Sequence, residues 1–237
     1  MEAFVQGLVQ GLTEFLPVSS SGHLVFLSKV FGFRGDLPYV AMLHLGTFFA
    51  VFIFTFRKLI YVLKRWKLIL MLVISTVPAA VVGVFFENYV EEAFNYSVLP
   101  LTFSLTAVFL LFASVFNGKK SMDEMTWWDA LIIGAAQAVA VIPGLSRSGL
   151  TIATGMMIGY KREDALYYSF LMSLPVTLGA GILNFEGAGA SGLIGLLFSF
   201  IFGLLALFLL KKIVIMNKLH LFGYYLIAIA MISYFVR

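Results

Sequence analysis

The sequence contains no cysteine and carries very little charge. No disulfide, thiolate nucleophile or thiolate metal site is therefore available to it. Charged residues make up 12% of the chain and hydrophobic residues 61%, whereas an ordinary soluble domain has roughly 25% charged residues. So few charges cannot cover a soluble globule, and so much apolar surface excludes a disordered chain. The net charge of +4 is spread over short loops, so by itself it does not indicate nucleic-acid binding, and we expect no nucleic-acid partner.

The sequence has instead six long apolar segments without acidic, lysine or arginine residues. We expect membrane-spanning helices at 38–56, 68–86, 98–116, 165–185, 190–210 and 219–236. Each is close to the roughly 20 residues that cross a bilayer, and none alternates as the strands of a membrane barrel do. The chain begins Met-Glu-Ala-Phe without a basic stretch, so we expect no signal peptide. The sequence thus predicts an all-α polytopic membrane protein with one membrane domain over 1–237.

Two further apolar regions are interrupted by polar residues. Region 1–33 is broken at 17–22, and region 130–160 is broken at 143–149. Each arm is about 12–16 residues long, which is too short to span a bilayer. We therefore expect two re-entrant helical hairpins, each entering and leaving on one side of the membrane.

The basic residues support one orientation of this arrangement. If the N-terminus lies outside, twelve of the sixteen basic residues fall in inner loops, namely Arg57, Lys58, Lys64, Arg65, Lys67, Lys119, Lys120, Lys161, Arg162, Lys211, Lys212 and Lys218. The expected outer loops carry acidic residues instead, Glu87, Glu91, Glu92 and Glu186. Because inner loops are enriched in Lys and Arg, we expect both termini outside.

The two polar breaks resemble each other. One reads Pro-Val-Ser-Ser-Ser-Gly and the other Pro-Gly-Leu-Ser-Arg-Ser-Gly; Gln10 precedes the first and Gln137 the second. Each is followed by a short helix and three spans, but the two hairpins enter from opposite sides. We therefore expect an inverted-topology repeat of about 1–116 and about 128–237. Such repeats place a site near the midplane, where the hairpin tips meet.

The charged residues in these breaks are the main candidates for function. A charge facing lipid costs about 2.5–3.5 kcal/mol at the bilayer centre, so Glu14 and Arg147 should face each other or a ligand. One interpretation is an ion pair that merely joins the hairpins. The other is an anion site, since the fork of Arg147 and a helix N-terminus suit phosphate. The hydroxyls available beside Arg147 are those of Ser146, Ser148 and Thr151.

The first hairpin offers groups that act on a bound phosphate. Ser19, Ser20 or Ser21 can attack if a base activates it, and His23 can serve as acid, base or nucleophile. Glu14 can orient His23, accept a proton or hold a divalent cation. His44, within the span 38–56, is expected to be a hydrogen-bonded packing histidine.

These motifs resemble those of the bacterial undecaprenyl-pyrophosphate phosphatase family, also called the bacitracin-resistance family. The stretch from Gln10 to His23, QGLTEFLPVSSSGH, is similar to the first family motif. The stretch from Pro143 to Thr151, PGLSRSGLT, is similar to the second. The resemblance covers essentially the whole chain. Position 10 is Gln where the motif also allows Glu, which leaves one carboxylate there, and position 21 is Ser where Thr is common.

The resemblance implies a membrane phosphatase that converts polyprenyl pyrophosphate to the monophosphate and recycles the lipid carrier for wall synthesis, giving bacitracin resistance. Carried over by motif, it implies a site of Glu14, His23, Ser146, Arg147 and Thr151, with Ser20 and Gln10 in support. Together with the residues of both breaks, this leads us to expect a catalytic set of Glu14, Ser20, His23 and Arg147, and phosphate contacts from Arg147, Gln10, Ser19, Ser21, Ser146, Ser148 and Thr151. The resemblance allows for Mg²⁺ or Ca²⁺ held by Glu14, with no organic cofactor. It places the chain in the cell membrane, with the site opening to the outer face, and a homodimer is compatible with it.

Other functions compete with this interpretation. Inverted repeats with broken helices are typical of transporters, so a flippase for polyprenyl phosphate or a carrier of a small anion is the main alternative. The type 2 phosphatidic acid phosphatases need a histidine shortly after the Ser-Arg motif, and only His220 follows Arg147, which excludes them. A purely structural membrane protein has no use for Glu14, His23 and Arg147 in the membrane.

Overall fold

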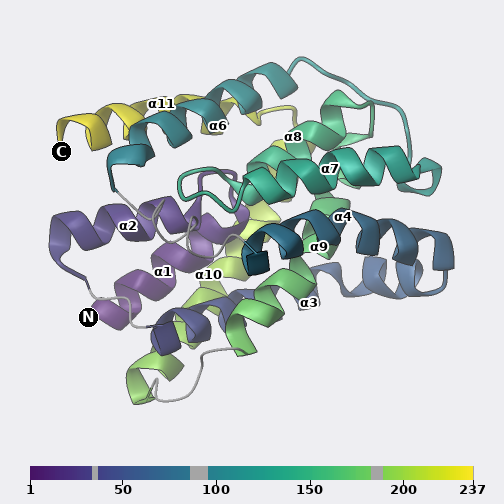
Figure 1. Cartoon of the computed structure of the whole chain (residues 1–237). Helices are drawn as coiled ribbons and strands as arrows, with labels where there is room; N and C mark the ends of the chain where they lie inside the picture. Colours follow the sequence, from purple (N-terminus) through teal and green to yellow (C-terminus); the bar gives the residue numbers. More distant parts are fainter. Residues whose placement is uncertain (34–36, 86–95, 183–188, 237) are drawn as a thin grey trace.

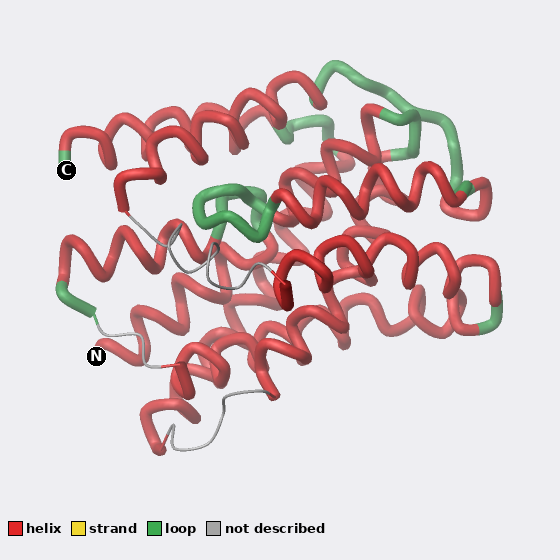
Figure 2. The backbone as a smooth tube through the Cα atoms, in the orientation of Figure 1, coloured by secondary structure: helices red, strands yellow, loops and turns green. Residues whose placement is uncertain are grey.

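The computed structural model describes residues 1–33, 37–85, 96–182 and 189–236, and this part of the chain is helical apart from its turns (Figures 1 and 2). Within it, five helices are long and apolar enough to cross a membrane. They are α3 (Leu37–Leu63), α4 (Trp66–Phe85), α6 (Leu99–Ala113, preceded by the single turn η1, Tyr96–Val98), α9 (Arg162–Ile182) and α10 (Gly189–Ile215). The predicted helical, multi-pass membrane protein is thus confirmed. The sixth expected span corresponds to α11 (His220–Phe235), which is apolar but has only 16 residues.

The helix ends correct the expected loop boundaries. Helix α3 continues through Arg57 and Lys58, and α10 continues through Lys211 and Lys212, all of which the sequence placed in loops. Long basic side chains at a helix end can extend into water while the backbone stays helical, so charge alone does not end a span. The expected outer acidic residues, together with Arg34 and Arg237, lie outside the described residues.

Both predicted broken regions are pairs of short helices. The first consists of α1 (Glu2–Phe15) and α2 (Ser20–Phe31), and the second of α7 (Trp127–Val139) and α8 (Arg147–Met157). They have 11 to 14 residues each, well short of the roughly 20 that cross a bilayer. The first helix ends before Pro17, where Leu16 is extended, as residues before proline tend to be.

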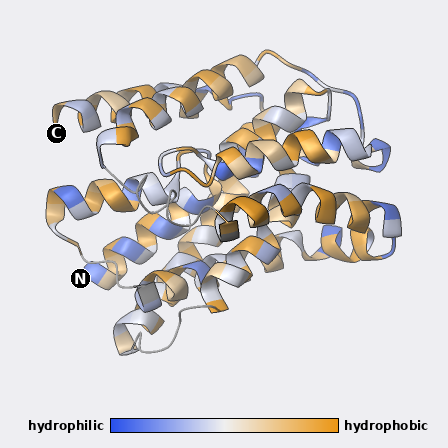
Figure 3. Cartoon of the chain, in the orientation of Figure 1, coloured by the Kyte–Doolittle hydropathy of each residue, from blue (hydrophilic) through white to orange (hydrophobic). Residues whose placement is uncertain are grey.

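Of the four short helices, α1, α7 and α8 pack against long helices, whereas α2 lies against α1. Helix α1 lies against α10 and α3, α7 lies against α4, and α8 lies among α6, α7 and α9, while α3 pairs with α9 and α6 with α11 (Figure 1). The α1–α10 contact depends on glycine, because a Cβ on Gly11 would come within 2.7 Å of the Ser199 carbonyl oxygen. Figure 3 shows apolar residues along most of these helices, with hydrophilic residues gathered at turns such as that between α3 and α4.

Candidate functional site

The tips of the two hairpins meet through hydrogen bonds. The Gly144 backbone N–H donates to Ser19 Oγ at 3.1 Å, and the Ser148 hydroxyl donates to the Leu16 carbonyl oxygen at 3.2 Å. Ser19 also caps α2, with its Oγ accepting from the Gly22 N–H at 3.3 Å. Residues more than a hundred positions apart are thereby held in register, as the sequence predicts for meeting tips.

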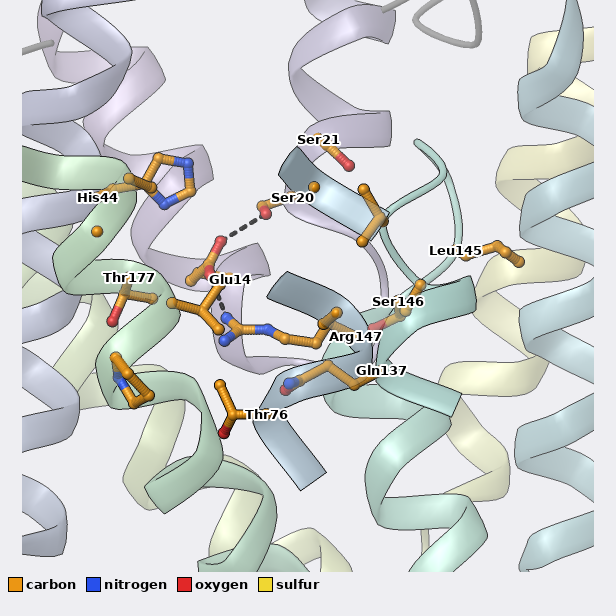
Figure 4. Close-up of a pocket in the computed structure, with 18 of the residues that line it drawn as sticks. Glu14, Ser20, Ser21, His44, Thr76, Gln137, Leu145, Ser146, Arg147 and Thr177 are labelled. Carbon is orange, nitrogen blue, oxygen red and sulfur yellow. Dashed lines mark hydrogen bonds and ion pairs between the residues drawn. The ribbon is translucent and has the colours of Figure 1, made fainter. Parts of the chain in front are cut away.

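The predicted contact between Glu14 and Arg147 is present. Nη2 of Arg147 donates to Glu14 Oε1, and the two side chains are 16% and 6% exposed. The second carboxylate oxygen of Glu14, Oε2, accepts from the Ser20 hydroxyl at 2.6 Å and from Gln10 Nε2 at 3.0 Å. Figure 4 shows Ser20, Glu14 and Arg147 in one line of contacts. Both carboxylate oxygens are therefore engaged, and Ser20 lies within the reach that a base needs to activate a nucleophile.

This cluster lines a pocket of about 620 Å³ (Figure 4). Glu14, Ser19, Ser20, Ser21, Ser146 and Arg147 all line it, as do Leu145 and four polar residues of the surrounding helices: His44, Thr76, Gln137 and Thr177. The rest of the wall is small and apolar, and consists of Ala79, Ala80, Gly83, Ala140, Val141, Pro175, Val176, Gly179 and Ala180. A polar end beside an apolar passage suits a ligand with a charged head and a hydrocarbon tail.

Several buried polar atoms around this pocket have no hydrogen-bond partner among the described residues. They are Nη1 of Arg147, Oε1 of Gln10, and both Nε2 and Oε1 of Gln137. Because an unpaired buried polar group costs roughly 1–3 kcal/mol, and more when charged, a ligand that supplied partners to these atoms would be bound favourably. Glu14 thus bonds Nη2 of Arg147 and leaves Nη1 without a partner among the described residues. This unpaired donor argues against an ion pair with a purely structural role.

The structure places His23 apart from this cluster. Its Nδ1 donates to the Ser19 carbonyl oxygen at 2.7 Å, so Nε2 accepts from the Tyr225 hydroxyl of α11 at 2.6 Å. The ring also stacks on Tyr225 and packs edge-on against Phe103. His23 does not line the pocket, and both of its ring nitrogens are bonded to residues other than Glu14, so the expected orientation of His23 by Glu14 is absent here. Tyr225 belongs to the last helix, and no local pattern could have revealed this contact.

Three other predicted phosphate contacts have structural partners. Thr151 Oγ lies 2.6 Å from Ser169 Oγ and bonds the Arg147 carbonyl oxygen at 2.8 Å, which ties α8 to α9 below the tip. Ser148 bonds the first hairpin, as described above. Gln10 does not line the pocket, but its amide nitrogen hydrogen-bonds two residues that do, Glu14 and His44.

Sequence reasoning missed part of the polar wall. His44 does form a hydrogen bond, as expected of a packing histidine, but it also faces the pocket. Thr76 and Thr177 belong to no motif, and in the sequence Gln137 is notable only for its place before the second break, yet all three line the pocket. The available signal was a polar residue inside an apolar segment, which does not say which way the side chain turns.

The pocket residues do not fit a cation site built by the protein alone. Glu14 is the only carboxylate among the lining residues, and its oxygens are bonded to Arg147, Ser20 and Gln10. The described residues contain no group of three or more His, Cys, Asp or Glu side chains that could hold a metal. Mg²⁺ and Ca²⁺ usually take several oxygen ligands, and this set offers too few.

The sequence matches the family of the bacitracin resistance protein BacA over residues 3–232. The chain belongs to this family. It is 46% identical to the undecaprenyl-diphosphatase of Thermotoga petrophila over 232 residues, which cover 97% of this chain and 98% of that protein. It is 42% identical to that of Thermosipho africanus over an alignment of 247 positions that covers both chains fully. A relative of the same name in Methanococcus maripaludis strain C7 is 45% identical over 237 residues, with 95% of each chain covered.

Family membership confirms the resemblance that the two motifs carried. The match spans both hairpins and the helices between them. The pocket, its half-used arginine and its serines therefore lie where both motifs of the family come together, which makes this the candidate active site.

Proposed function

We propose that this protein is an integral membrane phosphatase that hydrolyses undecaprenyl pyrophosphate to the monophosphate and inorganic phosphate. Such an activity recycles a lipid carrier for wall synthesis and gives bacitracin resistance. The family match and the relatives named undecaprenyl-diphosphatase support it. The observation that carries it is Arg147 Nη1, a buried guanidinium donor that has no hydrogen-bond partner among the described residues and lies in a pocket lined by four serines. A diphosphate supplies the missing acceptors.

The contacts favour Ser20 as the nucleophile. Ser20 Oγ attacks the terminal phosphorus, its proton passes to Glu14, and the bridging P–O bond breaks to release the lipid monophosphate, which takes that proton. Water then attacks the phosphoserine and gives its proton to Glu14, which returns it to Ser20 as phosphate leaves. The 2.6 Å contact between Ser20 and Glu14 supports this assignment, and Arg147 stabilises the charge on the phosphoryl oxygens.

His23 takes a different part in this proposal from the one the resemblance implies. Both of its ring nitrogens are engaged outside the pocket, so attack by His23, or activation of water by it, has no geometric support in this arrangement. We assign it the role of fixing the Ser19 carbonyl, and with it the turn that presents Ser20. Tyr225→Phe should then lower activity modestly, whereas it should raise activity if His23 were the nucleophile, because it frees the lone pair of Nε2.

The apolar wall suits the isoprenoid tail. Small residues of α4 and α9 line it, and a Cβ added at Gly83 or Gly179 would meet no atom within 4 Å. We propose that the first isoprene units lie between these two helices and that the rest of the tail extends into lipid. Glu14 is the one carboxylate among the residues that line the pocket. A divalent cation would therefore be bound chiefly by oxygens of the diphosphate.

The pairing of the helices supports the inverted repeat. If α1, α2, α3, α4 and α6 correspond to α7, α8, α9, α10 and α11, then the α1–α10 contact corresponds to α7–α4. The α3–α9 and α6–α11 contacts then each join equivalent helices. We propose six spans, counting α11, and two re-entrant hairpins in the cell membrane, with both termini and the mouth of the site outside. Because the chain has no cysteine, single cysteines at Lys119 (inside) and Val236 (outside) test this with an impermeant thiol reagent.

The decisive experiment measures phosphate release by the purified protein from farnesyl and undecaprenyl pyrophosphates, with and without a chelator. The wild type should release phosphate, and Ser20→Ala and Arg147→Lys should lose that activity while remaining folded. A substrate labelled in its terminal phosphate should label the wild type at Ser20 on rapid quenching. A folded wild type that releases no phosphate would overturn the proposal. The mass in detergent checks the homodimer, which stays a prediction.

The transporter alternative keeps one supporting observation, the helix pairing just described, because inverted repeats around a midplane site are typical of transporters. Reconstituted vesicles distinguish the two functions. Movement of polyprenyl monophosphate between leaflets by Ser20→Ala, which should not hydrolyse, would establish a flippase activity besides the phosphatase.

A further inference from the structure

The histidine that faces the pocket is His44, on α3. Its Nδ1 lies 3.3 Å from Gln10 Nε2, and the same Gln10 nitrogen bonds Glu14 Oε2 at 3.0 Å. His44 lines the pocket together with Glu14, Ser20 and Arg147, and Figure 4 shows these four side chains around one space. No motif or function described so far uses this imidazole.

The contacts of Gln10 fix which nitrogen of His44 carries the proton. A carboxylate oxygen only accepts, so the side-chain amide of Gln10 must turn its NH₂ toward Glu14. That same NH₂ then faces Nδ1 of His44, and in the neutral ring Nδ1 must accept from it. The proton therefore resides on Nε2, and the ring is a donor at its far end.

The contrast with His23 shows that this is not ordinary packing. His23 has a protein partner at each ring nitrogen, the Ser19 carbonyl oxygen and the Tyr225 hydroxyl. For the His44 ring, Gln10 is the one hydrogen-bond partner found among the described residues, and it takes Nδ1. The Nε2–H of His44 therefore stays available in a pocket that Arg147 also lines, as expected for a ligand contact and not for a histidine that only packs.

We propose that His44 is a substrate-contacting residue that donates Nε2–H to a phosphoryl oxygen of the diphosphate, with Gln10 holding its tautomer. This inference rests on the proposed function and adds a donor to the same site. Arg147 supplies a charged donor through Nη1, and His44 supplies a neutral donor from another helix. Fixed donors aimed at developing charge are worth far more in a site that excludes water than in solution.

The kinetic test compares three substitutions. His44→Phe keeps a ring but loses the donor, and it should lower kcat/KM on the order of a hundredfold, the usual cost of one such donor. His44→Gln keeps an amide N–H near the place of Nε2 and should recover a large part of that loss. His220→Phe is the matched control, because this histidine lies at the start of α11 and does not line the pocket; it should match the wild type. A His44→Phe enzyme within threefold of the wild type would overturn the inference.

A spectroscopic test does not depend on turnover. The chain has only three histidines, so ¹⁵N-labelled histidine gives few resonances, and His44→Gln assigns one of them. We expect the Nε2–H tautomer for His44 and a shift of that nitrogen when a non-hydrolysable farnesyl methylenediphosphonate binds. The Nδ1–H tautomer, or an unchanged resonance in protein saturated with the analogue, would refute the contact. If the wild type failed to hydrolyse any polyprenyl pyrophosphate, the proposed function would fall, and this measurement alone would decide the role of His44.

Discussion

Arg147→Lys is the substitution that best separates charge from geometry at this site. In the wild type, the guanidinium uses Nη2 for Glu14 and leaves Nη1 for a ligand. A lysine keeps the positive charge but offers a single ammonium in place of a planar fork. Its ammonium can pair with Glu14 or bind a phosphate, but it cannot hold both in the fixed geometry that Nη2 and Nη1 of the guanidinium provide.

The magnitude follows from what each substitution removes. Losing one preorganised donor to the transition state costs about 2.7–4 kcal/mol, or a factor of about 10² to 10³ in kcat. Because Glu14 keeps a cation nearby, Arg147→Lys should lose activity with a small change in stability. Arg147→Met should differ, because it leaves the 6%-exposed Glu14 side chain without a counter-charge, and breaking a buried pair in this way costs about 3–5 kcal/mol.

The assay combines phosphate release from undecaprenyl pyrophosphate with thermal unfolding in the same detergent. We expect Arg147→Lys to lose at least a hundredfold in kcat/KM at a nearly unchanged unfolding temperature, and Arg147→Met to lose both activity and stability. If Arg147→Lys retained kcat/KM within threefold of the wild type, the forked contact with the diphosphate would be wrong.

Three further predictions test the wall of the site and the first turn of α7. Gly179→Phe should fill the apolar passage and raise the KM for undecaprenyl pyrophosphate without lowering the unfolding temperature, whereas Ala228→Phe on the exposed side of α11 should do neither. Gln137→Leu should remove two unpartnered amide atoms, and so keep or raise stability while lowering kcat/KM. Burial alone would raise the pKa of Asp129, but hydrogen bonds from Thr126 and from the Tyr160 hydroxyl hold that pKa below its ordinary value. A lowered folded pKa stabilises the protein above the ordinary carboxyl pKa of about 4. That stability should be lost as the pH falls below 4, and less so in Asp129→Asn; equal acid unfolding curves would contradict this.

The sequence was informative where the signal is local. Arms too short to span and proline at the first break predicted the two pairs of short helices, and the cost of charge in lipid predicted that Glu14 would meet Arg147. The two histidines show the limit. His23 lies inside a motif yet turns toward Tyr225, and His44 lies outside both motifs yet faces the pocket. The rotation of each helix about its axis depends on partners from distant segments, which a single sequence does not identify.

Ser19 offers a test of how firmly the two tips must be joined. It has φ of 70°, a left-handed conformation that side chains rarely adopt and that costs about 1–3 kcal/mol. Its hydroxyl oxygen accepts from the Gly22 and Gly144 N–H groups, so the cost is offset by a helix cap and by the contact between hairpins.

Glycine and alanine at this position separate the two contributions. Ser19→Gly relieves the backbone but leaves the Gly144 N–H unpaired, while Ser19→Ala keeps the unfavourable φ and loses the same bonds. We therefore expect the unfolding temperature to fall in the order wild type, Ser19→Gly, Ser19→Ala. Both variants should lose kcat/KM, because Ser20 and Arg147 are then no longer held across the gap. An alanine variant as stable as the glycine variant would refute the backbone strain at Ser19. Full activity in both variants would show that the hydrogen bond between Ser19 and Gly144 is not needed to hold Ser20 beside Arg147.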